Sequence, residues 1–357
     1  MTRRRSGAGT AKLDRAFCCC GSPFLGRSVL QAFLYNADGH DQEVELDQQC
    51  LVGLDERTLL WVDVSGRNRD EMGHLVRLFG LDRGSGRELL NPQEAPYLDN
   101  YGEYFQFDVI GLSRGENDNG DRALTRWLPV HLDFLVGPGW IITVHDGELP
   151  FLQAFRDQDK GETVIGALSL PALAASLLDW HLSAYFEAVS ELEEFLDRLD
   201  EAMLAHSARR SLLAGVVGMR RKVSELRHFL NQQRPVFYAL SRPDFAQIFE
   251  SDAAAHYQSL ERRFERAVDA VDHARELVSG SFELFTTRTA EATNDLVRRL
   301  TFVTVMLGVV GAVAGVFGMN FETPYTQTGV LGFWVVIGAL GAFIGIAVGL
   351  ARRRGWI

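Results

Sequence analysis

Two long segments near the C-terminus contain no charged residue, and they limit the possible folds more than any other feature. They cover 301–321, TFVTVMLGVVGAVAGVFGMNF, and 323–351. A helix that spans a bilayer needs about 20 mostly apolar residues, and each segment reaches that length. No apolar run of comparable length precedes residue 300. We therefore predict two membrane-spanning helices, over 301–321 and 329–351.

The basic residues beside these spans predict their orientation. Arginines occupy 298–299 before the first span and 352–354 after the second, whereas the loop 322–328 has no Lys or Arg and one acidic residue, Glu322. Lys and Arg near a span stay on the cytoplasmic side. We expect a multi-pass protein of the cytoplasmic membrane with both termini cytoplasmic. The loop then faces outward, and 352–357 forms a basic cytosolic tail.

The residues before the spans predict a cytosolic α/β domain over 28–168. The segment 68–81 has apolar residues at helical spacing, whereas its neighbours alternate or are continuously apolar, as strands are. The predicted strands cover 28–35, 42–46, 58–66 and 101–112, and a hairpin covers 129–147. Strands with interspersed helices are typical of an α/β layer architecture.

Long helices follow over 169–300. The first covers 170–204, and the second covers 211–240, where Pro235 is expected to kink or end it. The third is expected from about 245 to 320, into the membrane. At 1.5 Å per residue it would be roughly 110 Å long. Such a rod would couple the cytosol mechanically to the bilayer.

Charge and cysteine content exclude some functions. The formal net charge of −11 argues against nucleic acid as a partner, because binding phosphates needs a basic surface. We expect 1–27 to be a disordered leader; its run Cys18, Cys19 and Cys20 could also be palmitoylated or bind metal. The sequence contains no P-loop, GxSxG or HExxH motif, so we do not expect an enzyme or a prosthetic group.

One face of the first span carries small or polar residues at alternating spacings of three and four, the pattern of a helix stripe. We call these residues the stripe: Asn294, Val297, Thr301, Thr304, Gly308, Gly311, Gly315 and Gly318. Two interpretations are open. Small residues allow close helix packing in membranes, or several copies could turn this face inward to line a pore.

A second small-residue stripe lies on the second span, at Gly338, Gly341, Gly345 and Gly349. Two stripes favour an inner ring of first spans and an outer ring of second spans. A chain with two spans cannot enclose a channel alone, so a pore requires a symmetric oligomer.

Gly318-Met319-Asn320 at the outer end of the first of two C-terminal spans resembles the signature of the CorA family of divalent-cation channels. WVDV at 61–64, ELLN with YLDNYGEYFQF within 88–107, and IITVH at 141–145 are similar to segments of that family. The resemblance covers nearly the whole chain from about residue 28. It implies a funnel-shaped homopentamer in the lipid bilayer that transports Mg2+ and tolerates Co2+ and Ni2+.

The resemblance also implies roles for individual residues. Gly318, Met319 and Asn320 would form the selectivity filter, with Asn320 supplying a ring of carboxamide oxygens; alternatively, Asn320 is simply a helix C-cap. Glu322 would attract cations. Asn294 would line the cytosolic entrance, while Val297 and Leu300 would form a hydrophobic constriction that gates by dewetting. Relatives often have a bulky Met where this chain has Gly308.

A regulatory metal site is the last expectation from the resemblance. Acidic residues of neighbouring subunits would chelate Mg2+ between cytosolic domains, and loss of the ion would let them repel and open the gate. The candidates are Glu88 and Glu283, where aspartates are expected. Binding of Mg2+ by two carboxylates is chemically possible with either residue type.

Two alternative functions remain open from the sequence. A zinc transporter of the related ZntB type shares this architecture, although the complete GMN and the acidic loop FETPYTQT favour Mg2+ selectivity. A membrane-anchored signalling or scaffold protein would use the long helix to transmit a conformational change without moving an ion. Cation flux measurements in liposomes separate these possibilities.

Overall fold

The computed structural model describes residues 29–37, 42–52, 54, 58–115, 126–158, 165–205, 210–242, 245–249, 252–318 and 329–354. The expected leader 1–27, with Cys18, Cys19 and Cys20, and the expected outer loop 322–328 lie outside these residues. By contacts the chain divides into two compact units. The first comprises 1–115, 127–181 and 232–262, and the second comprises 116–126, 182–231 and 263–357.

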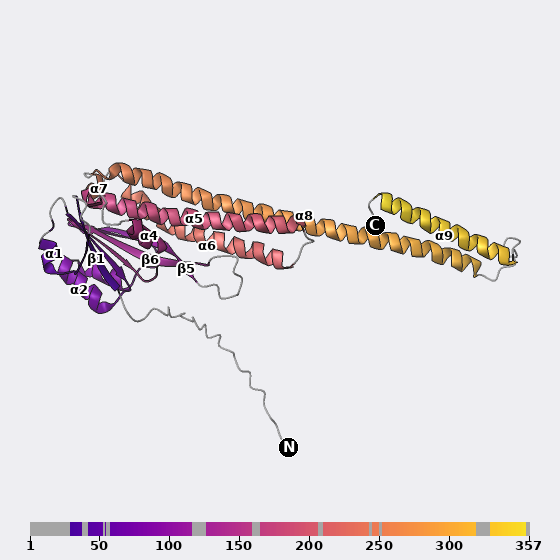
Figure 1. Ribbon diagram of the computed structural model, residues 1–357, viewed down its shortest axis with the longest axis horizontal. Coiled ribbons are helices and arrows are strands. Elements are labelled where there is room, and N and C mark those ends of the chain that lie inside the picture. Colours follow the sequence, from indigo (N-terminus) through magenta and orange to yellow (C-terminus); the bar gives the residue numbers. More distant parts are fainter. Residues whose placement is uncertain are drawn as a thin grey trace, which may run out of the picture. The chain divides into compact units, whose positions relative to one another are not determined.

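Up to β7 the chain contains strands with three interspersed helices, and the described elements from α4 onward are helices (Figure 1). The strands are β1 Val29–Asn36, β2 Gln42–Val44, β3 Thr58–Ser65, β4 Leu98–Asn100, β5 Phe105–Gly115, β6 Arg126–Gly137 and β7 Trp140–His145. The helices are α1 Gln48–Val52, α2 Arg69–Phe79, α3 Arg83–Leu90, α4 Pro150–Gln158, α5 Leu170–Ala205, α6 Arg210–Leu240, α7 Ala246–Phe249, α8 Ala254–Phe317 and α9 Gly329–Arg353.

The first unit contains one seven-stranded mixed sheet in the order β2-β1-β3-β7-β6-β5-β4. β3 and β7 pair in parallel, with Leu60 opposite Trp140 and Ser65 opposite His145. The β1–β2 and β6–β7 pairs are antiparallel, and the second confirms the predicted hairpin over 129–147. β3 is buried along nearly its whole length, as expected for a strand with helices on both faces.

Alternate residues of β3 separate the two faces of the sheet. Val62 belongs to the core cluster that contains Met72 of α2 and Leu89 of α3. Trp61 points to the other face, where its ring meets Phe155 of α4 edge-on at 5.8 Å between centroids. Helices therefore cover both faces, and in Figure 1 α2 and α4 flank the strands.

Helix α3, Arg83–Leu90, was not predicted from the sequence. The segment RGSGRELL contains two glycines, which weaken a helix considerably. The Asp82 side chain caps the helix by accepting from the Gly84 backbone N at 2.6 Å. A Cβ at Gly86 would come within 2.8 Å of Val76 in α2. This close helix contact explains the glycine and stabilises α3 against its low propensity.

The second long helix covers Arg210–Leu240, which confirms the predicted range, and Pro235 lies inside it without ending it. One expectation for the long helices was wrong. The third helix does not run from about 245: α7 ends at Phe249, and α8 begins at Ala254. Turn-favouring Asp252 precedes α8, and its carboxylate accepts a 2.5 Å hydrogen bond from Ser169 instead of joining the helix. At 64 residues α8 is about 95 Å long.

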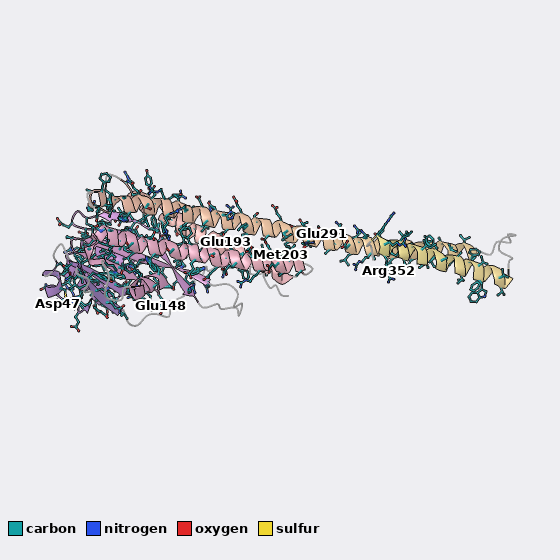
Figure 2. The ribbon with its side chains drawn as sticks, turned by 45° about the horizontal axis from the view of Figure 1, so that its top comes forward. Asp47, Glu148, Glu193, Met203, Glu291 and Arg352 are labelled. Atoms are coloured by element: carbon teal, nitrogen blue, oxygen red, sulfur yellow. The ribbon has the colours of Figure 1, made fainter. Side chains whose placement is uncertain are left out.

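The second unit contains the C-terminal part of α5, most of α6, and α8 from 263 onward with α9. Arg227 of α6 pairs with Asp272 of α8 at 2.5 Å, and Ser281 of α8 donates to Asp200 of α5 at 2.9 Å. Beyond Phe282, α8 has almost no buried side chain. Figure 2 shows it extending past Met203, near the end of α5, with Glu291 just beyond.

The two predicted C-terminal apolar helices are present. α8 and α9 each contain a stretch that is long and apolar enough to cross a membrane, and neither stretch is buried inside the chain. Both figures show α9 running alongside the last part of α8. The outcome is an α/β domain, long helices and two C-terminal apolar helices, as expected.

Candidate functional site

The stripe lies on one continuous helix. From Asn294 to Gly315 all its residues are within α8, and Gly318 follows directly, its backbone N donating to the carbonyl of Ala314 at 2.9 Å. Val297 and Leu300, the expected constriction, are 55% and 67% exposed. Their apolar side chains are therefore free to contact lipid or other copies of the chain.

The two threonines of the stripe donate their hydroxyl protons to carbonyl groups of α8. Thr301 Oγ1 donates to the carbonyl of Val297 at 2.8 Å, and Thr304 Oγ1 donates to that of Leu300 at 2.9 Å. A hydroxyl has one proton and two lone pairs. Each oxygen therefore offers only acceptor capacity away from its own helix.

The glycines of the stripe are not required by packing within one chain. A Cβ placed on Gly308, Gly311 or Gly315 would meet no heavy atom within 4 Å. The same holds for Gly338, Gly341, Gly345 and Gly349 of α9. Both small-residue faces are therefore open, and contacts with α9 in the same chain do not explain the glycines of α8.

The expected selectivity filter is described only in part. Gly318 ends α8 in a turn, whereas Met319, Asn320 and Glu322 lie outside the described residues. The roles proposed for these three residues therefore rest on the sequence pattern.

The two candidate regulatory acids lie in different units. Glu283 is an exposed residue of α8, and steps of four, three and four lead from it to Asn294, so it shares the face of the stripe. Glu88 is a partly buried residue near the end of α3. Their pairing was expected between subunits, so the positions within one chain do not test it.

The surroundings of Glu88 favour its protonated form. Partial burial raises the pKa of its carboxyl, and the negative charge of Asp99 raises it further, while a hydrogen bond from Gln93 acts in the opposite direction. Gln93 Nε2 donates to Oε1 at 3.0 Å. The hydroxyl of Tyr97 also lies near, but its single proton is donated to Asp133. Oε2 of Glu88 is buried and accepts no hydrogen bond from the described residues.

Sequence analysis missed a buried polar network beneath α3, centred on Arg67 and Asp133. Their side chains are 5% and 0% exposed and meet at 2.6 Å. Tyr97 and Gln106 join them: Gln106 Nε2 donates to the Tyr97 hydroxyl at 2.5 Å. The available signal was an aspartate inside an apolar strand, at Asp108 in FQFDVIGL and Asp133 in HLDFLV, because buried charges must be paired.

The Asp108–His131 pair extends this network. His131 Nδ1 lies 2.7 Å from Asp108 Oδ2. Burial raises the pKa of Asp108, and the hydrogen bond to Asp108 raises the pKa of His131. Among the described residues, no group of three or more His, Cys, Asp or Glu is placed to hold a metal ion.

Comparisons with known proteins agree with this architecture. The family described as "CorA-like Mg2+ transporter protein" matches residues 56–353. The cobalt/magnesium transport protein CorA of Methanocaldococcus jannaschii is 21% identical, and the match covers 90% of this chain and 97% of that protein. The complete structure of the CorA magnesium transporter from the same organism has a TM-score of 0.71 at 19% identity, over 91% of this chain and 98% of that chain.

The fold is also similar to that of a second solved structure. The ZntB cytoplasmic domain from Vibrio parahaemolyticus has a TM-score of 0.55 at 12% identity, and the match covers 74% of this chain and 98% of the ZntB domain. At these identities the structural likeness establishes the fold. The family match covers most of the sequence, including both apolar helices, and this chain therefore belongs to the CorA-like Mg2+ transporter family.

Proposed function

We propose that this chain is a divalent-cation channel that moves hydrated Mg2+, and tolerates Co2+ and Ni2+, across the cytoplasmic membrane. Five copies would place α8 around a common axis and α9 outside, with both termini cytoplasmic. The observation that supports this proposal is the stripe. Its hydroxyl protons are used in bonds within α8, and Gly308, Gly311 and Gly315 are open, on a helix that ends at Phe317, directly before Gly318-Met319-Asn320 in the sequence.

The chemistry of the stripe suits a hydrated cation. Mg2+ sheds its water reluctantly, and the bound waters point their hydrogen atoms outward. A conduit for such an ion needs acceptors of hydrogen bonds. Thr301 and Thr304 offer hydroxyl lone pairs, and Asn320 would offer a carboxamide oxygen. A neutral amide ring can bind the water shell without the tight binding of a carboxylate ring.

The constriction would act as the gate. The side chains of Val297 and Leu300 are apolar, and five copies of each around a narrow axis would exclude water when closed. Thr301 follows directly and would wet the wider part of the conduit. A long α8 that packs on α5 through Ser281 would carry movements of the cytosolic part to this point.

The regulatory ion would bind between subunits through Glu88 of one copy and Glu283 of another. The donor set fits: Mg2+ prefers carboxylate oxygens, and Oε2 of Glu88 is a buried oxygen that no described donor satisfies. A bound cation would also offset the burial and the Asp99 charge that disfavour an ionised Glu88. Loss of the ion would leave two carboxylates that repel.

Reconstituted vesicles test the proposed function. Vesicles that contain the wild-type protein should take up Mg2+ faster than empty vesicles, and Asn320→Ala should reduce this uptake at least about tenfold, because the filter loses its amide oxygens. Gln327→Ala removes an amide from the adjacent loop and should leave uptake unchanged. Parallel uptake of Co2+, Ni2+ and Zn2+ reports selectivity. Equal Mg2+ entry into protein-containing and empty vesicles would exclude a channel.

A further inference from the structure

The Arg67 guanidinium uses all its hydrogen-bond donors in the network beneath α3. A guanidinium has five N–H groups, and each of them meets an acceptor here, at distances between 2.6 and 3.4 Å. The acceptors are Asp146 Oδ2, Asp133 Oδ2 and the backbone carbonyls of Leu89, His131 and Val144. Arg67 therefore has no donor left for a further carboxylate.

Asp108 is a second carboxylate in this network, and it depends on a different donor. Its side chain on β5 is fully buried. Asp108 Oδ2 lies 2.7 Å from His131 Nδ1, whereas Asp108 Oδ1 is buried and has no hydrogen-bond partner among the described residues. Within the part of the chain that the structure describes, His131 is thus the one side chain that hydrogen-bonds to Asp108.

The buried charges of the network balance when the Asp108–His131 pair carries a proton. Asp133 and Asp108 are each fully buried, and Arg67 supplies one positive charge; Asp146 is 52% exposed, so water screens its charge. A buried carboxylate without a counter-charge is costly. A proton on His131, or on Asp108 itself, removes the unbalanced negative charge. The His131 side chain is 27% exposed, so this proton can exchange with water while the fold stays closed.

The other ionisable groups around the pair do not supply this charge. Arg67, Asp133 and Asp146 already bond to one another. The Tyr97 hydroxyl donates to Asp133 Oδ1 at 2.9 Å, and burial raises the pKa of Tyr97, so it stays neutral. On α3, the described contacts include no hydrogen bond from Glu88 to either member of the pair.

The surroundings also set the direction of the pH dependence. The hydrogen bond to Asp108 raises the pKa of His131, and burial raises the pKa of Asp108 to about 6. A group whose pKa is raised on folding stabilises the fold at low pH, and this effect is lost as pH rises through its folded pKa. Both members therefore act in the same direction. For His131 the loss occurs above about pH 6.5, the ordinary pKa of histidine.

We propose that the Asp108–His131 pair is a pH-sensitive switch in the α/β domain, which binds a proton and releases it as pH rises. The backbone N of Asp108 donates to the carbonyl of Tyr97 at 3.0 Å, and the His131 carbonyl accepts from Arg67. Release of the proton leaves an unbalanced buried carboxylate at this junction, which favours opening of the contact between β5 and the segment before β4. A network that only neutralised Asp133 would not need a second carboxylate beside it.

Hydrogen–deuterium exchange of the full-length protein in detergent, read by mass spectrometry and corrected for the intrinsic pH dependence of exchange, tests the switch. Between about pH 6.5 and 8.5, protection of wild-type peptides that contain the amide of residue 108 should fall, by at most about tenfold per pH unit for one proton. His131→Gln cannot carry the proton, so its protection should be low and independent of pH. Asp108→Asn removes the buried charge, so its protection should be high and independent of pH.

His74→Gln is the matched control, because His74 is an exposed residue of α2 in the same unit. It should keep the wild-type pH profile. The opposite directions expected for His131→Gln and Asp108→Asn separate a switch from a pair that serves only packing, whose loss would lower protection in both variants. Protection that is lowered in both, or that keeps the wild-type pH dependence in both, would overturn the proposal. A flat wild-type profile would overturn it without any variant.

Discussion

Thr301 and Thr304 are the two hydroxyl-bearing residues of the stripe, and in the proposed channel they would face a hydrated ion. Both hydroxyls donate to carbonyls one turn earlier, at 2.8 and 2.9 Å. This bond satisfies the proton without a partner outside the helix, which matters where lipid offers none. The remaining lone pairs can accept from the outward-pointing hydrogens of a hydrated cation.

Replacing both threonines by valine should therefore impair transport more than folding. Thr301→Val/Thr304→Val retains the side-chain shape and removes the hydroxyls, both their acceptor lone pairs and their bonds to α8 carbonyls. We expect Mg2+ uptake into vesicles to fall about tenfold, equivalent to about 1.4 kcal/mol. The control is Thr289→Val, because the Thr289 hydroxyl also bonds its own helix, to Phe285 at 2.8 Å, but lies off the stripe. Equal uptake in the double variant and the wild type would show that these hydroxyls do not contact the ion's water.

For single residues, the sequence indicated which side chains would be buried and paired, but not which residues they would pair with. An aspartate within an apolar strand, such as Asp133, signals a buried pair. Its partner Arg67 is 66 residues away, and only the pairing of β3 with β7 and of β7 with β6 brings the two together. The stripe could be predicted because helical spacing is local, whereas Met319, Asn320 and Glu322 lie outside the described residues.

Among the elements, α8 differs in side-chain burial along its length. Up to Ser281 its side chains pack on α5 and α6, and beyond Phe282 they are mostly exposed. The first part therefore packs on other helices of its unit, while the described residues bury few side chains of the second part. Movement of the packed part would be transmitted along the helix to the constriction at Val297 and Leu300.

A charged residue at the constriction should hold the conduit open. Leu300→Asp would hydrate the narrow point, and we expect basal Mg2+ conductance in planar bilayers to rise several-fold, even at an internal Mg2+ that closes the wild type. Phe302→Asp is a close control, because Phe302 is also an apolar residue of α8 but lies about 160° around the helix from Leu300. A wild-type basal conductance in Leu300→Asp would place the gate elsewhere.

The elements themselves could be predicted where one periodicity dominates. β3, α2, the β6–β7 hairpin and both apolar helices follow directly from their patterns. α3 could not, because its stability comes from the Asp82 cap and from contact with α2, not from the propensity of RGSGRELL. The start of α8 was also missed, because nothing in the local composition shows that Asp252 bonds to Ser169.

At the scale of the whole molecule, the exposed small-residue faces of the two apolar helices are the feature that bears on how several chains would assemble. Among the described residues, none comes within 4 Å of a Cβ placed on Gly308, Gly311 or Gly315 of α8 or on the glycines of the α9 face. Glycine-rich faces allow helices to approach closely in membranes, and two spans from one chain cannot surround an aqueous path. A symmetric assembly would give both faces a role: the stripe of α8 would line the axis, and the glycines of α9 would allow neighbouring helices to pack closely.

The number of copies can be measured without any assumption about transport. Native mass spectrometry of the detergent-purified protein should show a species of about five times the 39.8 kDa mass of one chain. Asn320→Ala should contain the same number of chains, because a filter side chain at the axis does not hold the ring together. A ring of another size would contradict the fivefold arrangement while leaving a conduit possible. A monomer under conditions where vesicles still take up Mg2+ would contradict the shared axis itself, because a single pair of spans leaves every stripe residue facing lipid.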